Sequence, residues 1–201
     1  MSALHELYFE LNRHLLQDEE PSQYLNSICD KPVFQQYPFD MLLKLRQTKQ
    51  SPKYHPEGSA WNHTMLVIDE AAKLKVRSKN PNAFMWAALL HDIGKPVTTR
   101  IRKGKITSYD HEKIGEKLAG EFLRTFTDDD RFIKEVNSLV RWHMQMLFVV
   151  KNLPFADIEE MKHEVDIQEI GLLGLCDRLG RLRADKEKEE QDMRLFLKKC
   201  N

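Results

Sequence analysis

Apolar residues recur three and four positions apart along most of this chain, which is the spacing of one helical face. Such patterns, together with unbroken apolar runs, cover residues 4–16, 23–29, 39–45, 61–76, 83–90, 111–122, 132–143 and 170–176. Residues 83–90 are apolar on every side of a helix, which predicts a helix in the middle of the core rather than at the surface. The pattern therefore predicts a bundle of helices.

One stretch has a strand-like pattern. Thr98 to Arg102 and Ile106 to Tyr109 lie on either side of Lys103-Gly104-Lys105, and two short runs around a glycine-containing loop are typical of a β-hairpin. Because this stretch follows His91 and Asp92 closely in the chain, we expect the hairpin to form a flap beside them.

The fold class we expect is all-α, a helical bundle with a short β-hairpin flap at about 98–109. The loops divide the chain into an N-terminal helical extension (1–50), a central domain (51–183) and a C-terminal charged helix (184–201) that packs on or extends the same domain. A length of 201 residues suits one domain with a sizeable core.

The composition describes a neutral chain. Its 31 basic and 31 acidic residues balance, so there is no general attraction to nucleic acid and any RNA contact has to be local. Cys29, Cys176 and Cys200 show neither disulfide density nor paired metal-ligand spacing, which is typical of reduced thiols. No signal peptide or membrane-spanning segment is visible, and we expect a cytoplasmic location.

His91 and Asp92 end the apolar run of residues 83–90 and are the most informative pair in the sequence. An unpaired buried carboxylate is costly, and the negative end of the helix dipole adds repulsion. A divalent cation would remove both penalties. The alternative is that Asp92 caps a turn or pairs with Lys95, while His91 is a hydrogen-bonded core histidine.

More imidazole and carboxylate side chains lie on or next to the apolar faces of other predicted helices. Each of them alone is more often structural than functional. Together with the His91-Asp92 pair they favour one shared metal site with ligands from separate helices. The candidate ligands are His63, His91, Asp92, His111, His143 and Asp177.

These ligand types restrict the choice of metal. Imidazole and carboxylate without thiolate suit manganese, iron, cobalt, nickel or magnesium, and the share of histidine argues against a purely oxygen-seeking magnesium or calcium site. Adjacent side chains on a helix point about 100° apart, so Asp92 can bridge two ions while His91 binds one. We expect one or two divalent ions.

The order of His63, His91-Asp92 and Asp177 resembles the HD superfamily of metal-dependent phosphohydrolases, and His111 and His143 match the expanded pattern of HD proteins with two metals. Over about residues 25–183 the chain is similar to the HD domain of bacterial tRNA nucleotidyltransferases, the CCA-adding enzymes. The matching motifs are Tyr54-His55-Pro56-Glu57-Gly58, Trp61-Asn62-His63-Thr64, Leu90-His91-Asp92-Ile93-Gly94-Lys95-Pro96, His111-Glu112-Lys113-Ile114-Gly115 and Cys176-Asp177-Arg178-Leu179-Gly180-Arg181. The nucleotidyltransferase head of those enzymes has no counterpart in this sequence, so CCA addition is not expected.

The resemblance implies an enzyme that hydrolyses phosphoesters. Two ions about 3.5 to 4 Å apart can hold a hydroxide between them and a phosphoryl oxygen across them. The substrate it implies is a phosphomonoester or phosphodiester of a nucleotide or RNA end, for example a 2′,3′-cyclic phosphate. It also implies one metal site formed by His63, His91, Asp92 and Asp177, and a second formed by His111 and His143 that shares Asp92.

Basic residues near the candidate ligands are candidates for holding phosphate. We assign catalysis to Asp92 and Lys95, and substrate binding to Lys95, Arg178, Arg181 and Arg100. A structural role is open to each of them as well. The helix dipole favours a lysine at position 95, acidic side chains can pair with Arg178 and Arg181, and Arg100 suits a solvated hairpin edge.

Two other functions use the same ligand types. One is a non-hydrolytic nucleotide- or RNA-binding module that keeps the fold, and the other is a di-iron oxygenase on the same fold. Iron together with oxygen consumption indicates the oxygenase, whereas phosphate release or cyclic-phosphate opening stimulated by manganese or nickel indicates the hydrolase.

Overall fold

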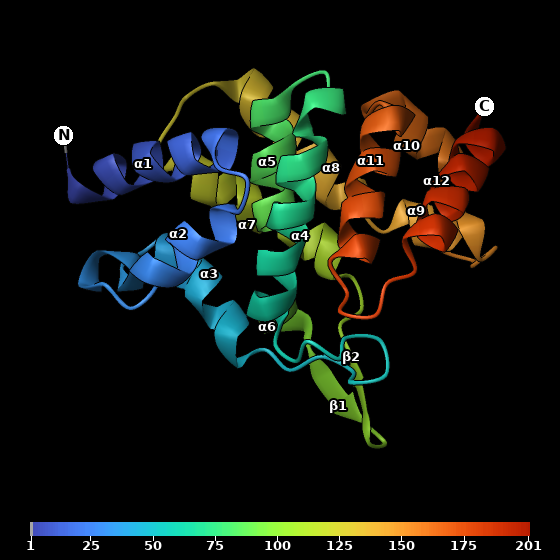
Figure 1. Ribbon diagram of the computed structural model, residues 1–201, viewed down its shortest axis with the longest axis horizontal. Helices are drawn as coiled ribbons and strands as arrows, with labels where there is room; N and C mark the ends of the chain where they lie inside the picture. Colours follow the sequence, from blue (N-terminus) through green and yellow to red (C-terminus); the bar gives the residue numbers. More distant parts are fainter. Residues whose placement is uncertain (1) are drawn as a thin grey trace.

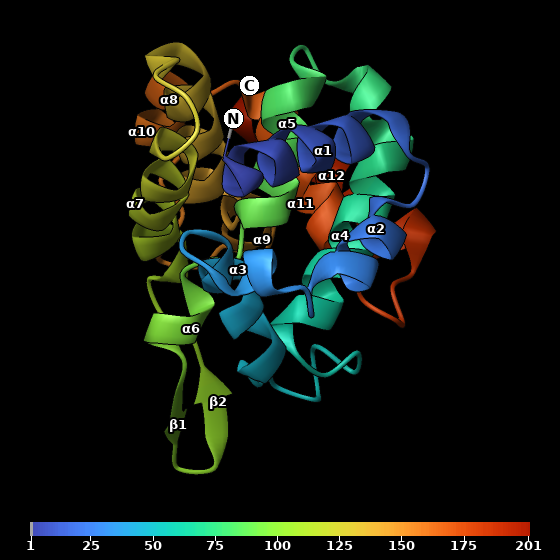
Figure 2. The same ribbon diagram turned by 90° about the vertical axis from the view of Figure 1, so that its left-hand side faces the viewer.

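The computed structural model describes residues 2–201 as a bundle of helices with one small hairpin. The hairpin projects from one end of the helical body, as two perpendicular views show (Figures 1 and 2). The elements follow in the order α1 (Ala3–Gln17), α2 (Pro21–Ile28), η1 (Pro32–Gln35), α3 (Phe39–Leu43), η2 (Lys44–Gln47), α4 (Ala60–Leu74), η3 (Lys75–Arg77), α5 (Pro81–Leu90), α6 (Lys95–Thr98), β1 (Arg100–Arg102), β2 (Lys105–Thr107), α7 (His111–Arg124), α8 (Asp130–Trp142), α9 (Gln145–Val150), α10 (Ile158–Glu164), α11 (Ile167–Leu179) and α12 (Lys186–Cys200).

The expected all-α class and the hairpin are both confirmed, although the strands are shorter than the sequence pattern indicated. The antiparallel register pairs Arg100 with Thr107 and Arg102 with Lys105. Thr98 belongs to the short helix α6 instead of the hairpin. The reason is Pro96, because a proline in the first turn of a helix loses no hydrogen bond and has the helical φ already set.

Helix α5 occupies the centre of the bundle. It contacts α1, α4, α8 and α11, and residues 83–90 are all buried, as the unbroken apolar run predicted. The helix begins at Pro81, and the side chain of Asn80 caps it by accepting a hydrogen bond from the backbone N–H of Ala83. It ends at Leu90, so His91 and Asp92 follow directly from the most buried helix of the fold.

Polar caps set the starting points of other helices. The side chains of Ser59, Asp129 and Asp166 accept hydrogen bonds from backbone N–H groups in the first turns of α4, α8 and α11. The residue at which a helix starts fixes the direction in which each later side chain points. These caps therefore help to direct His63 of α4 and Asp177 of α11 towards the interior.

The first and last helices share the core with the middle of the chain. Tyr8 of α1 stacks on Trp86 of α5 with ring centroids 4.9 Å apart, and the indole N–H of Trp86 donates to Asn12 at 2.7 Å. At the other end, α12 packs against α9 and α11.

The division at residues 50 and 183 stays a prediction. Of the helices described, none combines the length and the apolar character that crossing a membrane requires.

Glycine 94 allows α6 to approach α7 closely. A Cβ atom at Gly94 would lie 2.1 Å from the carbonyl oxygen of His111 and 2.7 Å from the backbone nitrogen of Gly115. Neither backbone atom can move without displacing the start of α7, which carries His111.

We expect Gly94→Ala to lower the free energy of unfolding by about 2–4 kcal/mol, because the added methyl group overlaps backbone atoms. Gly115→Ala is the matched control at the same crossing. Its Cβ would lie 3.2 Å from the Val140 side chain and at ordinary contact distance, 3.6 Å, from the backbone atoms of Gly94 and His91. Because alanine also favours the helix by about 1 kcal/mol, we expect a change of less than about 1 kcal/mol. Urea denaturation measures both variants, and equal stabilities would contradict the proposed overlap.

Candidate metal centre

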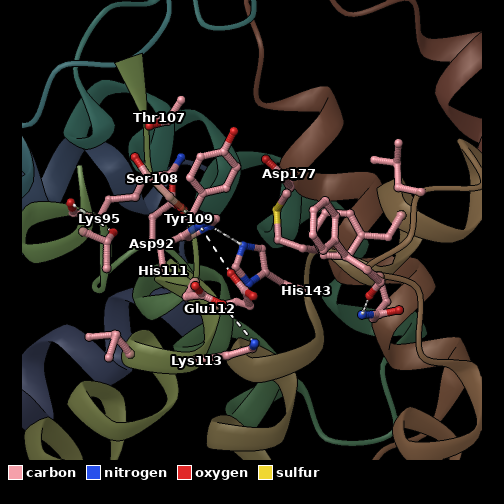
Figure 3. A pocket seen from close by; sticks show the side chains of 18 of the residues that line it. Asp92, Lys95, Thr107, Ser108, Tyr109, His111, Glu112, Lys113, His143 and Asp177 are labelled. Carbon is pink, nitrogen blue, oxygen red and sulfur yellow. Dashed lines mark hydrogen bonds and ion pairs between the residues drawn. The ribbon is translucent and has the colours of Figure 1, made fainter. Parts of the chain in front are cut away.

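Several helix ends meet at one point inside the bundle. Three of them are C-terminal ends, whose partial negative charge favours a cation. Each end contributes imidazole or carboxylate groups, of which Figure 3 shows Asp92, His111, His143 and Asp177. The groups are His91 and Asp92 after α5, His143 after α8, Asp177 in the last turn of α11, His63 in the first turn of α4 and His111 at the start of α7.

The carboxylate of Asp92 lies at the middle of this cluster and is only 1% exposed. Its Oδ1 atom is 3.4 Å from Nε2 of His111 and 4.0 Å from Nε2 of His143, and its Oδ2 atom is 3.2 Å from Nε2 of His91. The structure therefore surrounds one buried carboxylate with three imidazole rings that come from three separate segments.

Backbone carbonyls orient these three rings. The Nδ1 atoms of His91, His111 and His143 lie 2.7 to 2.8 Å from the carbonyl oxygens of residues 88, 108 and 140. For His91 and His143 these carbonyls belong to the last helical turn, where no intrahelical partner exists. Since each Nδ1 donates a proton to a carbonyl, each Nε2 keeps a lone pair directed at the cluster.

The spacing of the lone pairs suits a shared cation. The Nε2 atoms of His111 and His143 are 3.2 Å apart, and two acceptor nitrogens at that distance repel one another. Two nitrogens bound to one ion at about 2.1 Å each, at octahedral or tetrahedral angles, lie about 3.0–3.4 Å apart. The observed separation is therefore that of neighbouring ligands.

Unsatisfied buried atoms point to the same conclusion. Nε2 of His91 and Oδ1 of Asp92 are buried and have no hydrogen-bond partner among the described residues, which costs about 1–3 kcal/mol for each group. Potential ligand atoms gather in three groups; one contains His55, Glu57 and His63, and the other two share Asp92. Of these two, one contains His63, His91 and Asp92, and the other contains Asp92, His111 and His143. This donor set fits a metal ion.

His63 is held differently from the other histidines. Its Nε2 atom lies 2.8 Å from Oδ1 of Asp177, and its Nδ1 atom lies 3.0 Å from Oε1 of Glu57. Glu57 also accepts a hydrogen bond from Nδ1 of His55 at 2.8 Å. A carboxylate behind a metal-binding histidine fixes the orientation and the tautomer of the ring.

Sequence reasoning assigned no role to Glu57, His55 or Gln50, which all lie in the loop before α4. Gln50 accepts a hydrogen bond from Nζ of Lys95 at 2.6 Å, and the same ammonium lies 2.6 Å from Oδ2 of Asp92. The loop has no helical periodicity that would predict these contacts. The motif around His55 and Glu57 was the only available signal.

The charge states of Asp92, Asp177 and His143 are those that metal binding requires. Burial opposes the charge of Asp92, but the nearby His91 and Lys95 outweigh it and hold its pKa well below the ordinary value. Burial likewise opposes the charge of Asp177, where Arg181 and the hydrogen bond with His63 keep the pKa low. Burial and the neighbouring His111 and His91 lower the pKa of His143 to about 3, so this ring is neutral at pH 7.

The pKa of His63 is raised, in contrast to that of His143. Burial by itself lowers its pKa, but the hydrogen bonds with Asp177 and Glu57 outweigh burial and raise the pKa above the ordinary value. Two carboxylates therefore stabilise the protonated ring when no cation takes the place of its proton.

A cavity of about 1300 Å³ opens from the cluster to the surface. Lys95, Arg100 and Arg181 line it, and Arg181 lies 3.7 Å from Asp177. The structure does not bring Arg178 to this cavity. Its guanidinium forms two hydrogen bonds with Glu189 of α12, at 2.9 and 3.0 Å.

The comparison with protein families agrees with this geometry. A family model described as HD domain matches residues 60–182, which include all six candidate ligands. The chain belongs to the HD domain family. The match covers both the central helices of the bundle and the histidines and aspartates of the cluster.

The relatives of this HD chain are larger proteins. The Multifunctional CCA protein of Actinobacillus pleuropneumoniae is 40% identical over 93 residues, which are 45% of this chain and 21% of that protein. That of Hahella chejuensis is 31% identical over 103 residues (51% and 23%), and that of Methylococcus capsulatus is 27% identical over 132 residues (64% and 28%). The matches thus span less than a third of each relative's length.

We expect Glu57→Gln to weaken the binding of Mn²⁺ by about 10- to 100-fold, because a neutral amide oxygen is a weaker acceptor than the carboxylate for the Nδ1 proton of His63 and makes the ring a less basic ligand. Glu112→Gln is the matched control. Glu112 lies 3.6 Å from Nδ1 of His111, beyond hydrogen-bond distance, and that nitrogen already donates to Ser108. Competition with a fluorescent chelator measures both affinities, and native affinity in Glu57→Gln would contradict the role of Glu57.

The low pKa of His143 predicts a pH dependence of stability in the metal-free protein. An unfolded histidine titrates near 6.5, so between about pH 6.5 and 3 the unfolded state binds one more proton at this site. The free energy of unfolding should fall as the pH is lowered through this window. His143→Gln should reduce the slope by up to about 1.4 kcal/mol per pH unit. Urea denaturation in chelator at pH 4 to 7 tests this, and an unchanged slope would contradict it.

Proposed function

We propose that this chain is a metal-dependent phosphohydrolase that cleaves a phosphomonoester or phosphodiester of a nucleotide or RNA end, such as a 2′,3′-cyclic phosphate. The observation that carries the proposal is the pair of ligand groups that share the buried Asp92 at the base of a large cavity. Membership of the HD domain family and the likeness to CCA proteins support this reaction class and this kind of substrate.

The ligands divide between two positions in this proposal. Asp92 belongs to both positions, because it is the member common to two of the groups of ligand atoms. One position is formed by His63, His91, Asp92 and Asp177, and the other by Asp92, His111 and His143. Bound there, divalent ions would supply Lewis acidity for the phosphoryl oxygens and activate water as the nucleophile.

Lys95 keeps Asp92 ionised and can also hold phosphate. An ammonium group has three N–H donors, and the contacts with Asp92 and Gln50 use two of them. Because Lys95 lines the cavity, the third donor is available to a phosphoryl oxygen.

Arg181 is the second proposed phosphate-binding residue. Its Nε atom is buried and has no hydrogen-bond partner among the described residues, and the side chain lines the cavity beside Asp177. A phosphate oxygen would satisfy this donor with a charge-assisted hydrogen bond. Arg178 is left out of the proposed set, because it does not line this cavity and its guanidinium pairs with Glu189.

We expect Asp92→Asn to reduce Mn²⁺- or Ni²⁺-stimulated hydrolysis of cyclic and linear phosphoesters by more than about a hundredfold, and to lower the metal content, because it removes the shared ligand. Asp128→Asn, in the exposed loop before α8 and away from the cavity, is the control and should keep native activity. A screen of phosphomonoesters and phosphodiesters with metal analysis measures both. Native hydrolysis by Asp92→Asn would refute the proposal.

The same assays separate the other functions that these ligands allow. Bound iron with oxygen consumption and no phosphate release would indicate an oxygenase, and bound metal without turnover would indicate a binding module. His111→Ala should retain one ion per chain if the centre holds two, whereas an unchanged metal content would place His111 outside it.

A further inference from the structure

We propose that the β1–β2 hairpin and the aromatic rim of the cavity bind a single-stranded nucleic acid, so that the phosphohydrolase acts on the end of a strand in preference to a free mononucleotide. The inference rests on the proposed function for its reaction. It rests on a separate part of the molecule for the binding, namely the surface between the hairpin and the loop after α9.

The cavity is larger than the pockets that usually bind one small molecule. Its volume is about 1300 Å³, whereas pockets for small ligands hold about 300–1,000 Å³. It extends from Asp92 to the hairpin residues Arg100 and Arg102 on one side, and to Phe148 and Phe155 on the other. The space continues past the metal centre in two directions, which suits a chain molecule.

One face of the hairpin is basic and is directed to this space. Side chains alternate between the two faces of a strand, so the register places Arg100, Arg102, Lys105 and Thr107 on the same face. Arg100, Arg102 and Thr107 line the cavity. The hairpin projects from the helical body, so this face extends the cavity beyond the bundle (Figure 2).

The charges on this face have no acidic partner among the described residues, although Arg100 donates a hydrogen bond to the carbonyl oxygen of Thr99 at 2.8 Å. Arg102 and Lys105 lie directly opposite one another, and like charges in that position destabilise a hairpin. Among the described residues, no carboxylate lies within 4.0 Å of the charged groups of the hairpin, whereas Lys95 and Lys113 nearby both have acidic partners. A phosphate backbone would remove this repulsion.

Exposed aromatic rings complete the surface. Tyr54, Tyr109 and Phe155 are 57%, 62% and 59% exposed, and all three line the cavity although they come from separate loops. Figure 3 shows Tyr109 close to the candidate ligands. Exposed rings stack on unpaired bases with about 1–3 kcal/mol per base, whereas the bases of a duplex are already stacked. The rim therefore favours a single strand.

A solvated edge would by itself account for lysines on the hairpin, because charged edges discourage aggregation. This applies to Lys103 in the turn between the strands. It does not account for two arginines that face a cavity, or for aromatic side chains exposed around the same opening.

Binding of a labelled 12-nucleotide single-stranded RNA, measured by fluorescence anisotropy with Mn²⁺ present, tests the inference. To prevent cleavage of the probe, the measurement uses Asp92→Asn as the parent protein. We expect the triple change Arg100→Gln, Arg102→Gln and Lys105→Gln to weaken binding at least 10-fold. The slope of log K against log salt concentration should fall by about 2, since each phosphate contact contributes about 0.7.

The matched control removes three charges elsewhere. Arg131→Gln, Lys134→Gln and Lys198→Gln change exposed residues of α8 and α12, and should leave the RNA affinity and the salt slope at the parent values. Tyr109→Leu keeps an apolar side chain without the aromatic ring, and should weaken binding about 5- to 100-fold. Equal melting temperatures of all variants show that the folds are intact.

Three outcomes would overturn the inference. They are parent-like affinity of the hairpin triple variant, equal affinity for duplex RNA of the same length, and affinity for the 12-mer no greater than for a mononucleotide. Failure of the proposed function would give a different result. The screen of phosphomonoesters and phosphodiesters would then detect no hydrolysis, while the RNA affinities of the variants would still differ as expected here.

Discussion

The ionised carboxylate of Asp92 is the group on which the rest of the centre depends. It is almost completely buried, and burial alone would favour its neutral form. The ammonium of Lys95 compensates its charge directly, and the rings of His91, His111 and His143 direct nitrogen lone pairs at the same point, where a cation would complete the compensation. A buried charge is tolerated only with such compensation, which means that separate segments of the chain have to meet in one arrangement.

Helix ends supply that arrangement. The last turns of α5 and α8 have free carbonyl groups, and these accept the Nδ1 protons of His91 and His143. The same groups that terminate the helices therefore orient the rings. A change that shifts a helix end, such as added volume where α6 meets α7 at Gly94, would move the chemistry as well as the fold.

The two parts of the cavity differ in structure. Its base consists of helix ends whose side chains are buried, and its opening consists of loops and the hairpin, whose charges and rings face solvent. Under the proposed function, the bundle would determine the type of reaction. The choice of substrate would depend on the short segments at the opening, which can change with little cost to the core.

Local pattern was sufficient for the longer helices, for the hairpin and for the polar groups proposed as ligands, because helical periodicity and polar groups in apolar runs are properties of neighbouring residues. It did not predict α6, α9 and α10, which are too short to show a helical period. Nor did it separate the two arginines after Asp177: Arg181 lies past the end of α11 and 3.7 Å from Asp177, whereas Arg178 lies within α11 and pairs with Glu189. Only the tertiary structure placed Gln50, His55 and Glu57 beside the centre. These residues lie in a loop without periodicity, and the path of such a loop is decided by the surfaces on which it packs.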